Sequence, residues 1–258
     1  MCRSTPYDKW LVVPLLSCVL ISLCVTVVAR AQNERDIRAE EHGTVALGHE
    51  HHGSGTVYDS WEGSAAGIAY SEENHHIAGW MVILMGLAEV SHVMRLPSLM
   101  WARLLLPSAM LFIGIFLMIW SDHEAWPIGP LGFAETFFGE DHEIIQHKFY
   151  GLLALAVGCV ELFRRLGHME HLAWAMPLPL MAITVGMMLF SHSHGVHPSA
   201  QKIATHHAVM GTMAVTAGSS KLFSGWLYPG TGPERSKWEW SWAGLLLVIG
   251  AQLLIYAE

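Results

Sequence analysis

Charged residues are scarce in this chain, and basic residues are the scarcer kind. Lys and Arg account for 14 of the 258 residues, against 22 for Asp and Glu, and the formal net charge is -8. Phosphate binding requires clustered Lys and Arg, so this balance argues against nucleic acid as a partner. Hydrophobic residues make up 52% of the sequence and the mean hydropathy is +0.36, which is typical of integral membrane proteins.

Cysteine is almost absent, and so are the common catalytic motifs. The four cysteines, Cys2, Cys18, Cys24 and Cys159, form no CxxC pair and predict no disulfide framework. The chain contains no GxSxG, HExxH, phosphate-binding loop or dinucleotide fingerprint, so nothing supports a hydrolase, a nucleotide-driven pump or an NAD-dependent enzyme. Any bound metal ion must therefore be held by His, Met and carboxylates.

The first 74 residues predict an exported beginning. Residues 1–31 combine basic residues, the apolar run Leu11–Val28 and the small-x-small end Ala29-Arg30-Ala31, which predicts a cleavable signal peptide, with an uncleaved anchor as the alternative. Residues 32–74 are polar and Gly-rich and predict a flexible extracytoplasmic arm. Histidine-rich tracts bind transition metals, and this arm carries four histidines: His42, His49, His51 and His52.

Six apolar segments then follow in residues 75–258. They are Ile77–Met94, Leu104–Trp120, Phe149–Phe163, Leu172–Phe190, Ala208–Leu227 and Trp240–Ala257. Each approaches the roughly 20 residues that a helix needs to cross a bilayer. We therefore predict an all-α fold, a polytopic membrane bundle of six transmembrane helices.

Loop charges predict the orientation of this bundle. Arg and Lys are concentrated after the first, third and fifth segments, and basic loops stay on the cytoplasmic side. This places 14 of the 17 histidines and 16 of the 22 acidic residues outside, where negative potential concentrates cations. We expect a multi-pass protein of the cell (inner) membrane with a histidine-rich extracytoplasmic face.

The densest group of histidines lies in Ser191–His207, between the fourth and fifth segments. Together with other outer histidines, it supplies our candidate metal ligands. These are His75, His76, His123, His142, His147, His192, His194, His197, His206 and His207.

An internal repeat singles out three of these histidines. HHIAG from His75, HKFYG from His147 and HAVMG from His207 all read His-x-x-x-Gly, which predicts three helical hairpins. Glycine one turn after histidine leaves room for a neighbouring helix or a flat cofactor. Converging imidazoles suit copper or zinc, and the alternative is that the histidines only anchor helix ends. Met210 and Met213 are secondary candidates, because thioethers suit Cu(I).

Three ionisable residues extend the repeat. Glu89, Glu161 and Lys221 each follow their repeat histidine by fourteen positions. We expect them to snorkel toward the interface, with Glu161 paired to Arg164 or Arg165, and a proton-linked site or lower gate is the alternative.

The plan of outer His and Met clusters resembles bacterial copper-resistance and copper-uptake membrane proteins. HKFYG and HAVMG are also similar to helix starts in b-type cytochromes of the cytochrome b561 kind, which implies haem b ligands among His75, His147 and His207. Copper handling at the outer face is our first hypothesis, with an extracytoplasmic metallochaperone or redox partner. Haem-based electron transfer is the second, and a non-catalytic membrane subunit is the third.

Overall fold

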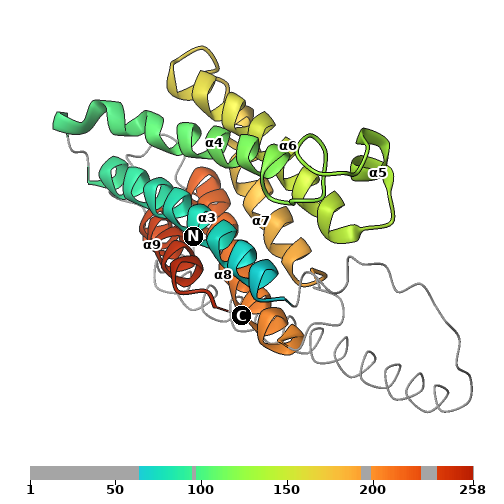
Figure 1. The fold of residues 1–258 in the computed structure, drawn as a ribbon. Helices are drawn as coiled ribbons and strands as arrows, with labels where there is room; N and C mark the ends of the chain where they lie inside the picture. Colours follow the sequence, from blue (N-terminus) through green and yellow to red (C-terminus); the bar gives the residue numbers. More distant parts are fainter. Residues whose placement is uncertain (1–63, 95–96, 193–198, 228–236, 258) are drawn as a thin grey trace, which may run out of the picture. The chain divides into compact units, whose positions relative to one another are not determined.

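The computed structural model describes residues 64–94, 97–192, 199–227 and 237–257 (Figure 1). The predicted signal peptide, residues 1–31, and the predicted arm up to residue 63 lie outside the described residues.

Helices make up the architecture, and no strand occurs among the residues that the structure describes. The elements are α3 (Ala65–Val93), η1 (Pro97–Leu104), α4 (Leu105–Ile119), α5 (Phe133–Phe138), α6 (His142–Arg165), η2 (Leu172–Ala175), α7 (Pro177–Leu189), α8 (Ala200–Leu227) and α9 (Lys237–Leu254). Within the described ranges, three stretches are long and apolar enough to cross a membrane: Ala65–Val93, Trp101–Ile119 and Leu172–Leu189. The all-helical class and the membrane-spanning character are thus confirmed in this coarser form.

Several helices extend beyond the apolar segments that predicted them. Helix α3 begins at Ala65, ten residues before the predicted boundary at His75, because the Ser64 side chain caps it by accepting from the Gly67 N–H at 3.1 Å. Residues 65–74 are therefore helical and not part of an irregular arm. Helix α8 likewise begins at Ala200, so His206 and His207 are helical residues. Polar residues such as Ser71–Asn74 lower the hydropathy of a helix end, so a hydropathy pattern does not detect it.

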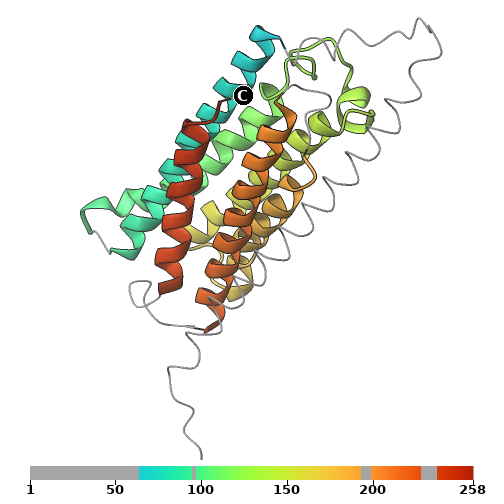
Figure 2. The ribbon, with the colours of Figure 1, turned by 90° about the horizontal axis from the view of Figure 1, so that it is seen from below.

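Glycine pairs set the closest helix packing. Helix α3 packs on α9, α4 on α6, and α7 on α8 (Figures 1 and 2). At each crossing a repeat glycine faces a glycine of the other helix: Gly79 faces Gly250, Gly151 faces Gly114, and Gly211 faces Gly186. A Cβ on Gly211 would lie 2.6 Å from the Gly186 carbonyl oxygen. The space beside the repeat glycines is therefore filled by a helix.

A second glycine strengthens the repeat. Gly86, Gly158 and Gly218 each follow the first repeat glycine by seven residues, and each meets side-chain or backbone atoms of the same paired helix. The full pattern is His-x3-Gly-x6-Gly-x2 followed by a charged residue, in α3, α6 and α8. Its positions lie on one helical face, so the histidine and the charged residue mark the two ends of the glycine contact.

One hydrophobic core joins all six long helices. Its buried members come from α3 (Ala88), α4 (Leu106, Met110), α6 (Val157), α7 (Leu178), α8 (Ala217) and α9 (Trp242, Leu246). This core lies nearer to the charged end of the repeat than to its histidine end, since Ala88 and Ala217 are within four residues of Glu89 and Lys221. The histidine end is left to polar contacts.

The glycine contact can be tested with a matched pair of substitutions. Gly211→Ala forces a methyl group against the Gly186 carbonyl, and we expect it to lower the free energy of unfolding by about 1–3 kcal/mol. Gly244→Ala in α9 meets nothing within 4 Å, so the same change there leaves stability equal or slightly higher. Thermal unfolding in detergent measures both. Equal effects at the two positions would contradict the packing role.

Candidate functional site

The three repeat histidines converge with a fourth from another helix. The ring centroids of His75 and His207 lie 6.0 Å apart, those of His207 and His192 4.8 Å, and those of His192 and His147 5.4 Å. The four imidazoles therefore form one row, which we call the histidine end of the bundle. Helices α3, α8 and α6 supply three of them, and His192 follows the end of α7.

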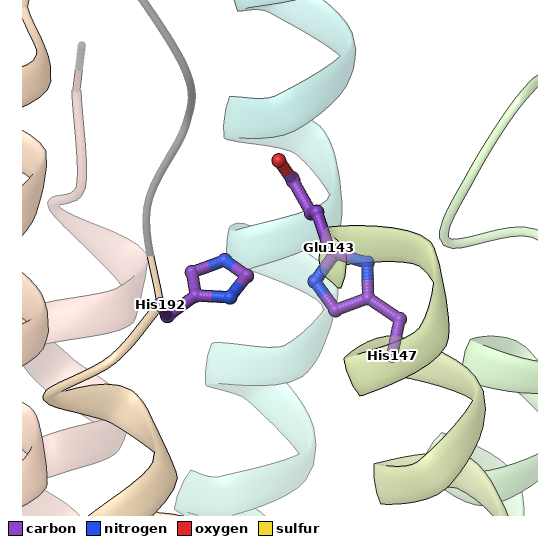
Figure 3. A group of neighbouring side chains, drawn as sticks. All are labelled: Glu143, His147 and His192. Carbon is purple, nitrogen blue, oxygen red and sulfur yellow. The ribbon is translucent and has the colours of Figure 1, made fainter. Parts of the chain in front are cut away.

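Three side chains of this end could share a metal ion. Glu143, His147 and His192 each offer one ligand atom, and these atoms all lie within 4.8 Å of one another (Figure 3). Glu143 and His147 are neighbours on α6 because residues four apart lie on the same helical face. The Asp141 side chain fixes the start of this helix by accepting from the N–H groups of Glu143 and Ile144. The geometry brings two imidazoles and a carboxylate to one point.

Hydrogen bonds donated by Nδ1 orient both imidazoles of this group. The Nδ1 atom of His147 donates to Asp122 Oδ1 at 2.6 Å, and that of His192 donates to Gln146 Oε1 at 2.7 Å. With Nδ1 as donor, Nε2 is the ring atom that would bind a metal, after loss of its proton where the ring is an imidazolium. Such outer partners of ligating histidines are typical of metal sites, where they fix the ring and raise its basicity.

Asp122 is itself held by a buried cation. Lys148, 1% exposed, donates to Asp122 Oδ2 at 2.9 Å and to the Leu117 carbonyl at 3.0 Å. Burial alone would raise the pKa of Asp122, but the charge and hydrogen bond of His147, with the charge of Lys148, lower it to about 2. Conversely, burial alone would lower the pKa of His147, and Asp122 raises it to about 9. Asp122 is therefore a stable anion behind His147.

A cavity lies beside two members of this group. It measures about 160 Å³ and is lined by the starts of α3 and α6 and the segment after α4. Its lining includes His75, His123, Glu124, Asp141, Glu143 and His147. Carboxylates and imidazoles around one opening attract cations. Two of the three candidate ligands, Glu143 and His147, thus face an entry path.

Apart from His207, whose ring contacts that of His192, the remaining predicted ligands have other neighbours. His75 donates through Nδ1 to the Ser71 carbonyl at 2.7 Å, and His76 donates through Nε2 to the Tyr256 carbonyl at 3.1 Å. His123 lines the cavity, His142 is exposed at the first residue of α6, and the His206 ring lies 5.5 Å from that of Tyr256. His194 and His197 lie outside the described residues. Met210 is buried, one turn into α8 from His207.

Four residues of this end were not predicted as site residues. Glu143 could have been found from its i, i+4 spacing to His147. Asp122 belongs to no motif, and its one sequence signal is the acidic segment in which it lies. Gln146 carries no sequence signal, because only the fold places it against α7. Tyr256, 2% exposed, stacks on His75 with centroids 4.0 Å apart, and its position near the chain end gave no reason to expect this.

Helix packing removes the observation that favoured a flat cofactor. Glycine beside histidine could have left room for haem, but Gly79, Gly151 and Gly211 each contact a glycine carbonyl or side chain of the paired helix. The row of imidazoles does not depend on these glycines and still supports the hypothesis of a bound metal ion.

Comparison with known proteins adds no assignment. No protein-family model, no curated protein and no solved structure matches this chain.

Proposed function

We propose that this protein binds a divalent transition-metal ion through Glu143, His147 and His192, with copper(II) as the leading candidate. The observation that carries the proposal is the meeting of these three ligand atoms within 4.8 Å, with Nδ1 of both imidazoles already donating to an oxygen. Metal–ligand bonds of about 2.0–2.2 Å place two ligands of one ion at most about 4.4 Å apart, so the side chains must close in around an ion.

The ligand chemistry favours copper(II) or zinc over copper(I). Imidazole suits both metals and carboxylate is a hard ligand, whereas copper(I) prefers thiolates and thioethers. Among the described residues, no cysteine belongs to the group. Zinc is the alternative ion for the same three side chains.

Uptake or delivery at the extracytoplasmic face fits this site best. Three helices apolar enough to cross a bilayer support a membrane location, and the basic loops support the outward orientation of the histidine end. The acidic cavity supplies a route from solvent to His147. In this proposal the histidine-rich arm captures the ion, alone or from an extracytoplasmic metallochaperone, and passes it to the cavity.

The site can be tested by copper(II) titration in detergent. The titration uses a variant of the full chain in which serine replaces the arm histidines His42, His49, His51 and His52, so that copper(II) binding by the arm does not contribute to the signal. We expect His192→Ala or Glu143→Gln to weaken copper(II) binding by at least about 100-fold, more than the loss of an outer partner would.

His168→Ala is the matched control for this titration. His168 is exposed beyond the far end of α6, so copper(II) affinity should stay unchanged. Equal affinity of the His192→Ala and His168→Ala forms would exclude the proposed ligand group, and binding of no metal by any form would reject the function.

The role of Gln146 gives a second, independent test. Gln146→Leu removes the acceptor for His192 Nδ1 and should weaken copper(II) binding by about 10–100-fold. Gln146→Glu keeps an acceptor oxygen and should bind at least as tightly as the parent. Calorimetry against a competing chelator compares the three forms. A Gln146→Leu protein with parental affinity would show that this hydrogen bond does not prepare His192 for the ion.

A further inference from the structure

The opposite end of the repeat carries a cluster of buried charges. Its members are Glu89, Glu161, Arg164, Arg165, Lys221 and Glu239, and we call it the ionic cluster. It contains three acidic and three basic side chains, so it has no formal net charge. Glu89 is 0% exposed and Glu161 1%. The expected pairing of Glu161 with its neighbouring arginines is confirmed, whereas Glu89 is enclosed and does not snorkel.

Glu89 is the centre of the cluster and links three other helices to α3. Its Oε1 accepts from Arg165 Nη2 of α6 at 2.6 Å, and its Oε2 accepts from Lys221 Nζ of α8 at 2.9 Å. Trp242 Nε1 of α9 also donates to Oε2, at 2.9 Å. One carboxylate therefore ties α3 to α6, α8 and α9.

Further bonds continue the cluster on both sides. Arg165 Nε donates to Glu161 Oε1 at 2.6 Å, and Lys221 Nζ donates to Glu239 Oε2 at 2.6 Å. The Ser224 hydroxyl donates to Glu239 as well. Arg165 also reaches the Arg103 carbonyl at 2.8 Å, which attaches η1. Through these bonds the cluster connects η1, α3, α6, α8 and α9.

The same helices carry the ionic cluster and the histidine end. Glu89, Glu161 and Lys221 stand fourteen residues after His75, His147 and His207. That separation is about 21 Å along a helix axis at about 1.5 Å per residue. The two polar groups therefore terminate one glycine-packed face in each of α3, α6 and α8.

Stability alone gives a weak reason for such a cluster. Desolvating paired charges offsets most of their attraction, and well-packed apolar residues often do as well. Ionisable residues in membrane-spanning helices usually mark pathways for ions. Ion pairs between helices have two discrete arrangements, formed and broken, so they can switch a helix interface.

We propose that the ionic cluster is the closed inner gate of a metal-ion route that begins at Glu143, His147 and His192. This inference rests on the proposed function. A cation that reaches the cluster must displace Lys221 or Arg165 from Glu89, which breaks the bonds that hold α8 or α6 to α3. Arrival of the ion and separation of the helices are therefore the same event, and the route stays closed in its absence.

Cysteine labelling tests the gate without any metal. In the full chain with its four cysteines replaced by alanine, Ala217→Cys places a thiol one turn from Lys221, at a position 1% exposed. We expect a water-soluble maleimide to label it about tenfold faster when Glu89→Gln removes the central charge, because the region opens locally. Ala109→Cys on α4, 4% exposed, should stay protected. Unchanged labelling of Ala217→Cys, or equal acceleration at both positions, overturns the gate.

Arg164→Gln is the matched control for the same measurement. Arg164 donates to Glu161 on its own helix, so its loss removes a charge and cuts none of the bonds between helices described above. Labelling of Ala217→Cys should therefore stay at the parental rate. An increase as large as that caused by Glu89→Gln would show that net charge, and not the interhelical bonds, closes the bundle.

Copper(II) flux into vesicles then separates the gate from the site. Reconstituted Glu89→Gln protein should carry copper(II) faster than the parent to a chelating dye inside, with unchanged copper(II) affinity in detergent. Unchanged flux at normal affinity overturns the gate and leaves the metal site intact. If no form binds copper(II), the metal site fails, and with it the assignment of the cluster as its gate, while labelling still reports whether the cluster closes the bundle.

Discussion

Close backbone contact between paired helices is the constraint on which the other features depend. Each repeat glycine faces a glycine of a second helix, and the carbonyl-to-Cβ distances of 2.6–3.1 Å leave no room for a methyl group. Small residues allow this approach where helices associate through van der Waals packing in an apolar solvent. Because histidine and the charged residue share the face of these glycines, fixing the glycine contact also fixes where both polar groups lie.

The two ends of the glycine contact handle polar groups in different ways. At the ionic end, every charge has an opposite charge within bonding distance, and Glu89 receives three donors. At the histidine end, oxygen acceptors engage Nδ1 of His75, His147 and His192. The first arrangement satisfies charges completely. The second fixes the orientation of the rings, and because Asp122 raises the pKa of His147 to about 9, a metal ion would have to displace a proton from that ring in order to bind it.

Sequence periodicity and spacing predicted much of this arrangement. Hydropathy located the six long helices of the described residues, since a continuous apolar run needs no knowledge of its neighbours, although three stretches there are apolar enough to cross a membrane. The repeat of His, Gly and a charge predicted that three histidines share a depth, and they do lie in one row with His192. It missed the start of α3, which Ser64 caps ahead of the predicted boundary, and the start of α8 at Ala200.

The partners of the histidines could not be predicted, because they depend on which helices pair. The first and last long helices, α3 and α9, pack together, and this brings Tyr256 onto His75 from 181 positions away in the chain. Asp122 and Gln146 reach His147 and His192 across similar interfaces. A repeat within one helix specifies depth and face, whereas the identity of the facing side chain is set by assembly of the bundle.

The histidine end and the ionic cluster differ in charge balance, and therefore in how each would interact with a cation. Around the histidine end, the cavity lining holds four carboxylates, Asp122, Glu124, Asp141 and Glu143, whereas two basic side chains, Lys148 and His147, contact Asp122. An incoming divalent ion is attracted there. The ionic cluster is neutral and already filled, so a cation gains by entering it only when it replaces Lys221 or Arg165. In the proposed route, the ion therefore binds first at the histidine end, which attracts cations, and separates the helices only when it reaches the neutral ionic cluster.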